Sequence, residues 1–158
     1  MKRSYMVMQD VNYELFADSV EAECSFGIQG SSPELVEKTL DELGLLTVRD
    51  RHPNTLSGGQ KQRVAIGSAL AANKSIIIFD EPTSGLDYKH MEEVAENFKK
   101  LSDQGKTLLI ITHDPELLYK CCTYFVFIEN GNICWSDGWS DRAKEKLVKF
   151  FKGSTQTR

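Results

Sequence analysis

The 158-residue sequence predicts an α/β protein with a parallel sheet and an inserted helical segment. Two short apolar runs, Ser75–Asp80 and Leu108–Thr112, do not alternate polar with apolar residues, which is typical of strands buried on both faces. Between them, apolar side chains recur at helical spacing, at Met91, Val94, Phe98 and Leu101. A strand, a helix and a second strand in this order favour a parallel pair joined by a right-handed crossover.

The composition fits one globular domain, with 41% hydrophobic and 27% charged residues. The net charge is −4, and no block of Lys and Arg indicates a nucleic-acid surface, so we expect no nucleic-acid partner. The longest apolar runs are too short to cross a bilayer. No sustained apolar segment follows Met1–Arg3, so we expect no signal peptide.

The cysteines are Cys24, Cys121, Cys122 and Cys134. None of them forms a C-x-x-C pair or has a histidine at metal-ligand spacing. Reduced thiols in a cytosolic protein are therefore the favoured interpretation.

The first half of the chain predicts two helices after a short apolar stretch. That stretch ends at Val7-Met8 and is broken by Gln9-Asp10. Ser32-Pro33 is typical of a helix start, with serine at the N-cap and proline at the first helical position, and Gly44 suits the end of that helix. Its apolar face carries Val36, Leu40 and Leu43. A polar loop then leads to Leu56–Gln60, which opens the second helix.

The second half continues the same alternation and ends in a hairpin and a helix. Gly105 is expected to end the helix between the two apolar runs. Tyr124–Glu129 and Asn132–Ser136 flank Asn130-Gly131, a strong signal for a two-residue hairpin turn. From Arg142 onward the sequence predicts a basic amphipathic helix, with apolar residues at Leu147, Val148, Phe150 and Phe151.

The segment Ser57–Gln60 combines a helix start with features of an anion site. Ser57 and Gln60 have capping-box spacing, and the two glycines between them leave backbone N–H groups uncovered. Because helix N-termini carry partial positive charge and free amides, a phosphate group can bind there. For these four residues alone, a capped helix without a ligand is the commoner case.

Polar residues also follow the two predicted strands. Asp80 and Glu81 lie at the carboxyl end of the first strand, where α/β sheets bind ligands. Asp80 suits Mg²⁺, which prefers hard oxygen ligands, and Glu81 could polarise an attacking water. His113 follows the second strand, so parallel pairing should place it near the two acids, where it could contact a γ-phosphate or orient that water. Taken singly, the acids also fit a solvated turn, and His113 a surface residue.

Taken together, these motifs resemble the ABC ATPase family. After Gln9-Asp10 come LSGGQKQR at Leu56–Arg63, SIIIFDEPTSGLD at Ser75–Asp87 and ITHD at Ile111–Asp114. The resemblance covers the chain from Gln9 to the hairpin, and its motifs are highly specific. It implies a P-loop NTPase-like fold, in which a parallel sheet carries an inserted helical subdomain.

By this resemblance, residues 1–158 form one partial ABC ATPase domain. Residues 20–70, approximately, would be the helical subdomain that carries the signature. Residues 1–19 and 71–158 would be the remainder of the RecA-like core, with the C-terminal hairpin and helix.

The resemblance also implies roles in binding and hydrolysing ATP with Mg²⁺. Asp80 corresponds to the Walker B aspartate that binds Mg²⁺, Glu81 to the catalytic glutamate and His113 to the switch histidine. Gln9 corresponds to the Q-loop glutamine, which reaches Mg²⁺ and the attacking water and senses the membrane partner. The signature, which contacts ATP held by the opposite subunit, corresponds to Ser57, Gly58, Gly59 and Gln60. The D-loop of the dimer interface corresponds to Ser84, Gly85, Leu86 and Asp87.

Within the family, the segment from Gln9 to Gly27 looks most like the ATPases of energy-coupling-factor and cobalt-type importers. Glu14 departs from that pattern, which often has glutamine at this position. The departure is mild.

The phosphate-binding P-loop, G-x-x-x-x-G-K-[ST], has no match in the 158 residues. Gly105-Lys106-Thr107 copies its last three positions, but Lys100 stands where the first glycine belongs, and the order is helix then strand. Lys74-Ser75 fails because Asn73 precedes it. The family places this loop upstream of Gln9, so we expect an N-terminally truncated domain that cannot hold or hydrolyse ATP by itself.

The missing segment also matters for folding. In the family it contributes neighbours for the predicted strands. Without it we expect exposed apolar surface and an open sheet edge, and hence oligomers or low solubility.

The resemblance implies an ATP-binding and hydrolysing subunit, or a fragment of one, that powers an ABC-type membrane importer. Its partners would be a second ABC ATPase subunit, in a homodimer or a heterodimer, and a transmembrane subunit contacted through the Q-loop region. It would be cytoplasmic and peripheral on the inner face of the cell membrane.

Three alternatives stay open. The chain could be a non-catalytic partner that completes an ATP site on another subunit. It could be a non-transport ABC ATPase related to DNA-repair or chromosome proteins, although the interval from Gln9 to Leu56 lacks the heptads of their coiled coils. It could also be a truncated reading frame without a function.

Overall fold

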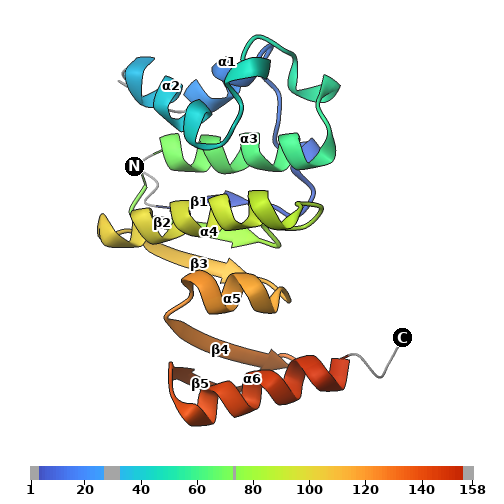
Figure 1. Ribbon diagram of the computed structural model, residues 1–158, viewed down its shortest axis with the longest axis vertical. Coiled ribbons are helices and arrows are strands. Elements are labelled where there is room, and N and C mark those ends of the chain that lie inside the picture. The colour runs from blue at the N-terminus through green and yellow to red at the C-terminus, as the bar shows by residue number, and fades with distance from the viewer. Residues whose placement is uncertain (1–3, 27–32, 73, 155–158) are drawn as a thin grey trace.

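A computed structural model describes residues 4–26, 33–72 and 74–154 (Figure 1). Its strands and α-helices, in chain order, are β1 (Ser4–Val7), α1 (Val20–Ser25), α2 (Pro33–Glu42), α3 (Gly58–Ala71), β2 (Ile76–Asp80), α4 (Tyr88–Asp103), β3 (Thr107–Ile111), α5 (Pro115–Cys121), β4 (Tyr124–Glu129), β5 (Asn132–Gly138) and α6 (Asp141–Ser154). Short 3-10 turns occur at Val11–Tyr13, Leu46–Val48 and Pro53–Thr55. In these ranges no helix combines the length and the apolar character that a membrane span requires.

The strands β1, β2 and β3 form a parallel sheet in that order. Val7 pairs with Phe79, and Phe79 pairs with Ile110. The predicted parallel pair joined through a helix is therefore confirmed for β2, α4 and β3. Compared with the prediction, β2 begins one residue later and β3 is shifted one residue toward the N-terminus.

Gly105 ends α4, as predicted. Its φ of +80° is the left-handed conformation that glycine adopts without a steric penalty. The N–H of Gly105 donates to Ser102 O at 2.9 Å, and that of Lys106 donates to Leu101 O at 3.1 Å, which closes the last helical turn. The strand β3 follows at once, so Gly105-Lys106-Thr107 terminates a helix and does not open one around a phosphate.

One face of the three-stranded sheet packs against α3 and α4. Val7, Ile77 and Phe79 point to this side and are completely buried. The ring of Phe79 lies on that of Phe98 in α4, with centroids 4.4 Å apart. Because each buried side chain of this size stabilises the fold by about 1.5–3 kcal/mol, these contacts hold both helices over the sheet.

The opposite face of this sheet is open. Its apolar side chains are substantially exposed, at 52% for Leu109, 48% for Ile111, 47% for Met6 and 40% for Ile76. They alternate along the strands with the buried residues of the other face. The prediction of strands buried on both faces is wrong for this chain, because the described helices cover one side only, whereas the expected exposed apolar surface is confirmed.

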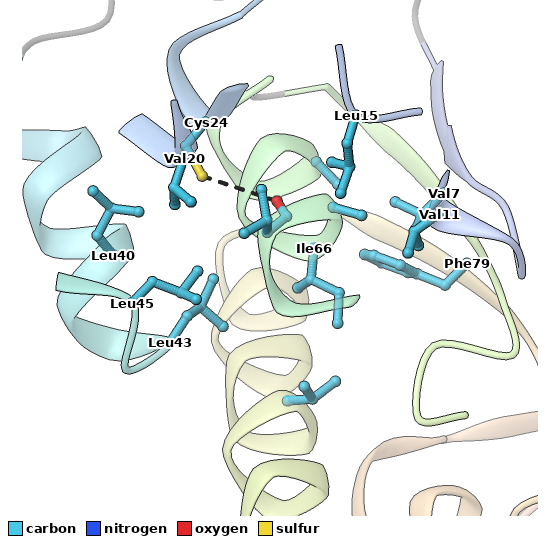
Figure 2. Packing of buried hydrophobic residues seen from close by; sticks show 14 of the residues in the cluster. Val7, Val11, Leu15, Val20, Cys24, Leu40, Leu43, Leu45, Ile66 and Phe79 are labelled. Atoms are coloured by element: carbon cyan, nitrogen blue, oxygen red, sulfur yellow. Dashed lines mark hydrogen bonds between the residues drawn. The ribbon is translucent and has the colours of Figure 1, made fainter. Parts of the chain in front are cut away.

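The helical segment above the sheet consists of α1, α2 and α3 around an aliphatic cluster (Figure 2). Side chains that point into this cluster include Val20, Leu40, Leu43, Leu45 and Ile66. The Cys24 thiol lies among them and donates to Val64 O at 3.9 Å, and burial raises the pKa of Cys24 to about 12. The predicted N-cap Ser32 lies outside the described residues, while Gly44, with φ of +61°, ends α2 as predicted.

Two glutamates hold the loop that follows β1. The carboxylate of Glu23 is buried and accepts the N–H groups of Phe16 and Ala17, each at 2.7 Å. Glu14 accepts the N–H of Met8 at 2.8 Å. Burial raises the pKa of Glu14, the hydrogen bond from Met8 opposes that shift, and the charge of Glu23 adds to it. The loop that carries Gln9 is therefore fixed by side chains from farther along the chain.

The C-terminal part forms a second, two-stranded sheet. Antiparallel β4 and β5 meet at Asn130-Gly131, both with positive φ, which matches the predicted hairpin turn. The strand β5 continues two residues beyond the predicted end, and the ladder shifts register between Phe127 and Ile128. The helix α6 packs on one face of the hairpin through Phe127 and Phe150, whose ring centroids are 4.7 Å apart.

We expect Gly67→Ala to destabilise the chain by about 1–3 kcal/mol, because a methyl group at this position would overpack the helical segment. The added Cβ would lie 2.9 Å from Cys24 Sγ and 3.2 Å from Leu43 Cδ1. Gly58→Ala in the same helix is the matched control, since nothing lies within 4 Å of its Cβ position. Urea unfolding followed by circular dichroism measures both, and equal stability of the two variants would contradict this packing.

We expect Glu14→Gln to be more stable than the wild type once Glu14 ionises. A raised pKa means that the folded chain holds this proton more tightly than the unfolded chain does, so wild-type stability falls as pH rises through the titration of Glu14. Glutamine keeps an acceptor for the Met8 N–H but never ionises. The difference between variant and wild type in free energy of unfolding should therefore grow with pH.

Glu14→Leu is the control for that measurement. It removes the acceptor, so it should be less stable than Glu14→Gln by about 1 kcal/mol at each pH. A pH-independent difference between Glu14→Gln and the wild type would show that this carboxylate is not penalised in the folded chain.

We expect the 158-residue chain to self-associate through the open face of the sheet. Light scattering at rising concentration should detect oligomers, and the double substitution Leu109→Lys with Ile111→Lys should shift the distribution toward monomer. Val148→Lys on α6 is a control of similar initial exposure. A wild-type chain that stays monomeric at high concentration would refute the prediction.

Candidate functional site

The candidate site lies where the three parallel strands end. Gln9 follows β1, Glu81 follows β2 and His113 follows β3. Because parallel strands end at one edge of a sheet, the side chains that follow them gather there. The predicted meeting of Glu81 and His113 is confirmed by a direct contact, with Nδ1 of His113 2.6 Å from Oε1 of Glu81.

Glu81 is held from several directions. Its N–H donates to Ile111 O at 2.8 Å, which continues the pairing of β2 with β3 by one residue. Its side chain is 16% exposed, while that of His113 is 78% exposed. Thr112 donates its hydroxyl to the second carboxylate oxygen at 3.3 Å. A carboxylate held in this way can act as a base toward a water, and the exposed imidazole beside it can reach a ligand.

The backbone of Glu81 is unusual for a residue other than glycine. Its φ is +49°, in the left-handed region, directly after a buried strand. Such conformations cost of order 1–3 kcal/mol and are common at functional sites. The turn aims the Glu81 carboxylate at the end of the neighbouring strand β3.

Asp80 is the last residue of β2 and pairs with Ile111. Strand alternation places it on the open face of the sheet, opposite to Phe79. Its carboxylate and the exposed Gln9 amide supply the oxygen donors that suit Mg²⁺. Within the described ranges no group of three or more His, Cys, Asp or Glu is placed to hold a metal. A Mg²⁺ bound here would therefore keep several waters and depend on phosphate oxygens.

The helix α3 begins with the predicted capping box. Ser57 Oγ accepts the N–H of Gln60 at 3.3 Å, and Gln60 Oε1 accepts the N–H of Ser57 at 3.0 Å. The N–H groups of Gly58 and Gly59 take no partner in the described part of the chain. Nothing lies within 4 Å of a Cβ placed on Gly58, so the space beside this residue is open to an anion. This helix start fits a phosphate group.

The segment Ser84–Asp87 lies against this helix start. A Cβ placed on Gly59 would be 3.4 Å from Leu86 Cδ2 and 3.5 Å from Gly85 O. Asp87 caps α4 by accepting the His90 N–H at 3.0 Å, and its other oxygen lies 2.7 Å from His90 Nδ1. The hydrogen bond from the His90 backbone lowers the pKa of Asp87, which favours the ionised form of this cap.

The predicted site residues thus form two groups. Glu81 and His113 contact each other at the strand ends, with Asp80 and Gln9 on the same edge of the sheet. Ser57–Gln60 meets Ser84–Asp87 at the start of α3. Among the described residues, the side chains of Ser57 and Gln60 bond to each other's backbone and not to Glu81 or His113.

Several supporting residues were missed in the sequence. Thr83 donates its hydroxyl to Asp114 at 2.9 Å and ties the turn after β2 to the start of α5. Lys61, next to the signature, donates to Asn12 Oδ1 at 2.7 Å in the loop after Gln9. Thr112 directly precedes His113, so its position beside Glu81 could have been inferred from the sequence. Lys61 and Asn12 lie 49 residues apart, and no local pattern connects them.

Arg63 fixes the other side of α3. Its guanidinium is buried and donates to Leu43 O at 2.7 Å, at the end of α2. Burial lowers its pKa, while the charges of Glu93 and Asp87 oppose that shift. The helix α3 is therefore hydrogen-bonded to the end of α2 through Arg63 and to the loop after β1 through Lys61.

Comparisons with known proteins agree with this geometry. A family profile described as ABC transporter matches residues 2–84. An ABC transporter ATP-binding protein of Treponema denticola is 48% identical over 132 residues, which cover 84% of this chain and 27% of the relative. The energy-coupling factor transporter ATP-binding protein of Mycoplasmoides gallisepticum is 36% identical over 134 residues, covering 81% of this chain and 48% of that protein. The chain thus spans about a quarter to a half of these relatives.

Solved structures show the same fold. The dimeric structure of an ATP-binding cassette in a post-hydrolysis state, bound to ADP and Pi, superposes with a TM-score of 0.75 and 30% identity. The match covers 87% of this chain and 63% of the cassette. The parallel sheet with its helical segment is therefore part of the P-loop NTPase fold of such cassettes. Because the family profile matches more than half of its residues, the chain belongs to the ABC transporter family of ATP-binding proteins.

Proposed function

We propose that this chain acts in a composite ATP site of an ABC-type importer and contributes the signature to ATP bound on another cassette. The observation that carries the proposal is the start of α3, where the free amides of Gly58 and Gly59 lie beside the D-loop segment Ser84–Asp87. This element offers a phosphate site that needs no further residue of the same chain. ATP and Mg²⁺ are the cofactors of the assembled site.

The residues at the strand ends, Gln9, Asp80, Glu81 and His113 (the strand-end group), act on a second ATP molecule. This requires a phosphate-binding loop beside them. Asp80 and Gln9 hold Mg²⁺, Glu81 polarises the attacking water, and His113 orients the water or contacts the γ-phosphate. Thr112 and His113 keep the Glu81 carboxylate in position. The sequence contains no G-x-x-x-x-G-K-[ST] motif, so we expect negligible binding of ATP by this chain alone.

The transmembrane partner binds the surface after β1. Three aromatic side chains are exposed there, 71% for Tyr13, 77% for Phe16 and 72% for Phe26. Glu23 holds the backbone of Phe16, so this surface is firm, and aromatic residues are enriched in protein interfaces. The chain then lies on the cytoplasmic face of the membrane without crossing it. The short helices α1 and α2 in this interval give no support to a coiled-coil head of the DNA-repair type.

The test uses a tester cassette, the Mycoplasmoides gallisepticum relative with its own signature inactivated by a serine-to-arginine substitution. The tester holds ATP but cannot complete a site with itself. Adding the 158-residue chain should restore ATP hydrolysis, because Ser57–Gln60 then reaches the ATP on the tester. Ser57→Arg in the added chain should lower the restored rate about 100-fold, as expected for loss of transition-state contacts.

Glu81→Gln is the matched control. In the composite site the base and the metal ligands belong to the tester, so this variant should restore hydrolysis as well as the wild type does. Isothermal titration of the chain alone with Mg-ATP should give no micromolar binding. The proposal fails if the chain restores nothing, if Ser57→Arg is as active as the wild type while remaining folded, or if Glu81→Gln abolishes the restored rate.

A further inference from the structure

Two adjacent cysteines stand at the junction between the parallel sheet and the hairpin. Cys121 is the last residue of α5, and Cys122 is its C-cap, two residues before β4. Both side chains are half-buried and reduced. No residue of the candidate ATP site contacts them through a described hydrogen bond, so they are free for a different chemistry.

The backbone at this pair is fixed by an aromatic contact. The indole N–H of Trp139 donates to the Cys122 carbonyl at 2.7 Å. The Trp139 ring stacks on Tyr119, with centroids 5.2 Å apart, and meets the edge of Phe125 at 4.6 Å. These contacts hold the end of α5 against the end of β5 and fix the backbone at Cys122.

The two sulfur atoms also interact with each other. The Cys121 thiol donates to Leu117 O at 3.3 Å, and a hydrogen bond joins the two cysteine side chains. That hydrogen bond lowers the pKa of Cys122 and raises the pKa of Cys121, and burial raises the pKa of both. Of the two thiols, Cys122 is therefore the more acidic.

Geometry disfavours a direct disulfide between them. Neighbouring Cα atoms on a trans peptide are about 3.8 Å apart, whereas disulfides usually span about 4.4–6.8 Å between Cα atoms. A soft atom bound to both sulfurs relieves this restraint, because it lengthens the bridge by one atom. Structural zinc usually needs four ligands, and no group of three or more His, Cys, Asp or Glu suited to a metal occurs in residues 4–26, 33–72 and 74–154.

We propose that Cys121 and Cys122 form a chelating dithiol site for trivalent arsenicals. Thiolates bind soft acceptors preferentially, and the arsenic of an organic arsenic(III) oxide can form two As–S bonds, one with each sulfur. Two As–S bonds form as the As–O bonds break, the two thiol protons leave with that oxygen as one water, and arsenic stays trivalent. No oxidant or reductant takes part.

The other two cysteines provide internal controls. Cys24 is fully buried, and its raised pKa keeps it protonated. Cys134 is exposed on β5 and has no neighbouring cysteine in the sequence. A single thiol forms arsenic adducts that an excess of a monothiol reverses, whereas a chelate persists until a dithiol competes for the arsenic.

The experiment incubates the 158-residue chain with phenylarsine oxide in excess 2-mercaptoethanol and records intact mass under native conditions. We expect one adduct with the loss of one water, removed by dithiothreitol. Cys121→Ser and Cys122→Ser should each abolish it, while Cys134→Ser should retain it. Circular dichroism verifies that the variants fold.

A second readout tests whether the fold builds the site. Binding should change the fluorescence of Trp139, and Trp139→Phe should lose that change while keeping the mass adduct. A peptide of residues 115–124 should bind about tenfold more weakly, since it must be ordered first. An adduct that survives either single serine substitution, the absence of any wild-type adduct, or a peptide that binds equally well would overturn the proposal.

Discussion

The parallel register of β1, β2 and β3 is the constraint on which the strand-end group depends. Because Val7 pairs with Phe79 and Phe79 pairs with Ile110, the three strands end at the same level. A slip of one residue would move Phe79 to the open face and turn Glu81 away from His113. The contact of Phe79 with Phe98 opposes that slip. Core packing on one side of the sheet therefore sets the chemistry at its edge.

The helix α3 combines structural and functional requirements in one element. Residues Gln62 to Ala69 are buried, so the helix cannot rotate without exposing apolar surface. Its first turn is polar and open, and the direction of its amides follows from how the rest of the helix is buried. Lys61 stands at the boundary between these parts and reaches Asn12. This hydrogen bond joins the loop after β1 to the residue that follows the signature.

Local patterns in the sequence predicted much of this architecture. The capping box at Ser57, the helix end at Gly105 and the turn at Asn130-Gly131 are each decided by a few adjacent residues, so tertiary packing does not override them. The contact of Glu81 with His113 also followed, because parallel pairing is a strong topological rule.

The prediction was wrong where it required knowledge of what covers a strand. An apolar run has the same letters whether its second face is buried or open, so the exposure of Leu109 was not visible in β3 itself.

Long-range polar contacts were beyond the reach of pattern reading. Lys61 with Asn12 and Thr83 with Asp114 join segments that are distant in sequence, and their residue types are common on any surface. The left-handed backbone of Glu81 was equally hidden, since glutamate has no preference for that conformation. Such features depend on how the fold brings segments together.

The position of Asp80 on the open face of the sheet links folding to chemistry. Its carboxylate shares that face with exposed Leu109 and Ile111. A polypeptide that covered the two apolar side chains would also displace water from around Asp80, and the lower local dielectric would strengthen its attraction to a divalent cation. Apolar burial and cation affinity at this edge are thermodynamically linked. Where the gain in attraction exceeds the cost of removing water from the carboxylate and the cation, a bound cation would stabilise the covered state by mass action.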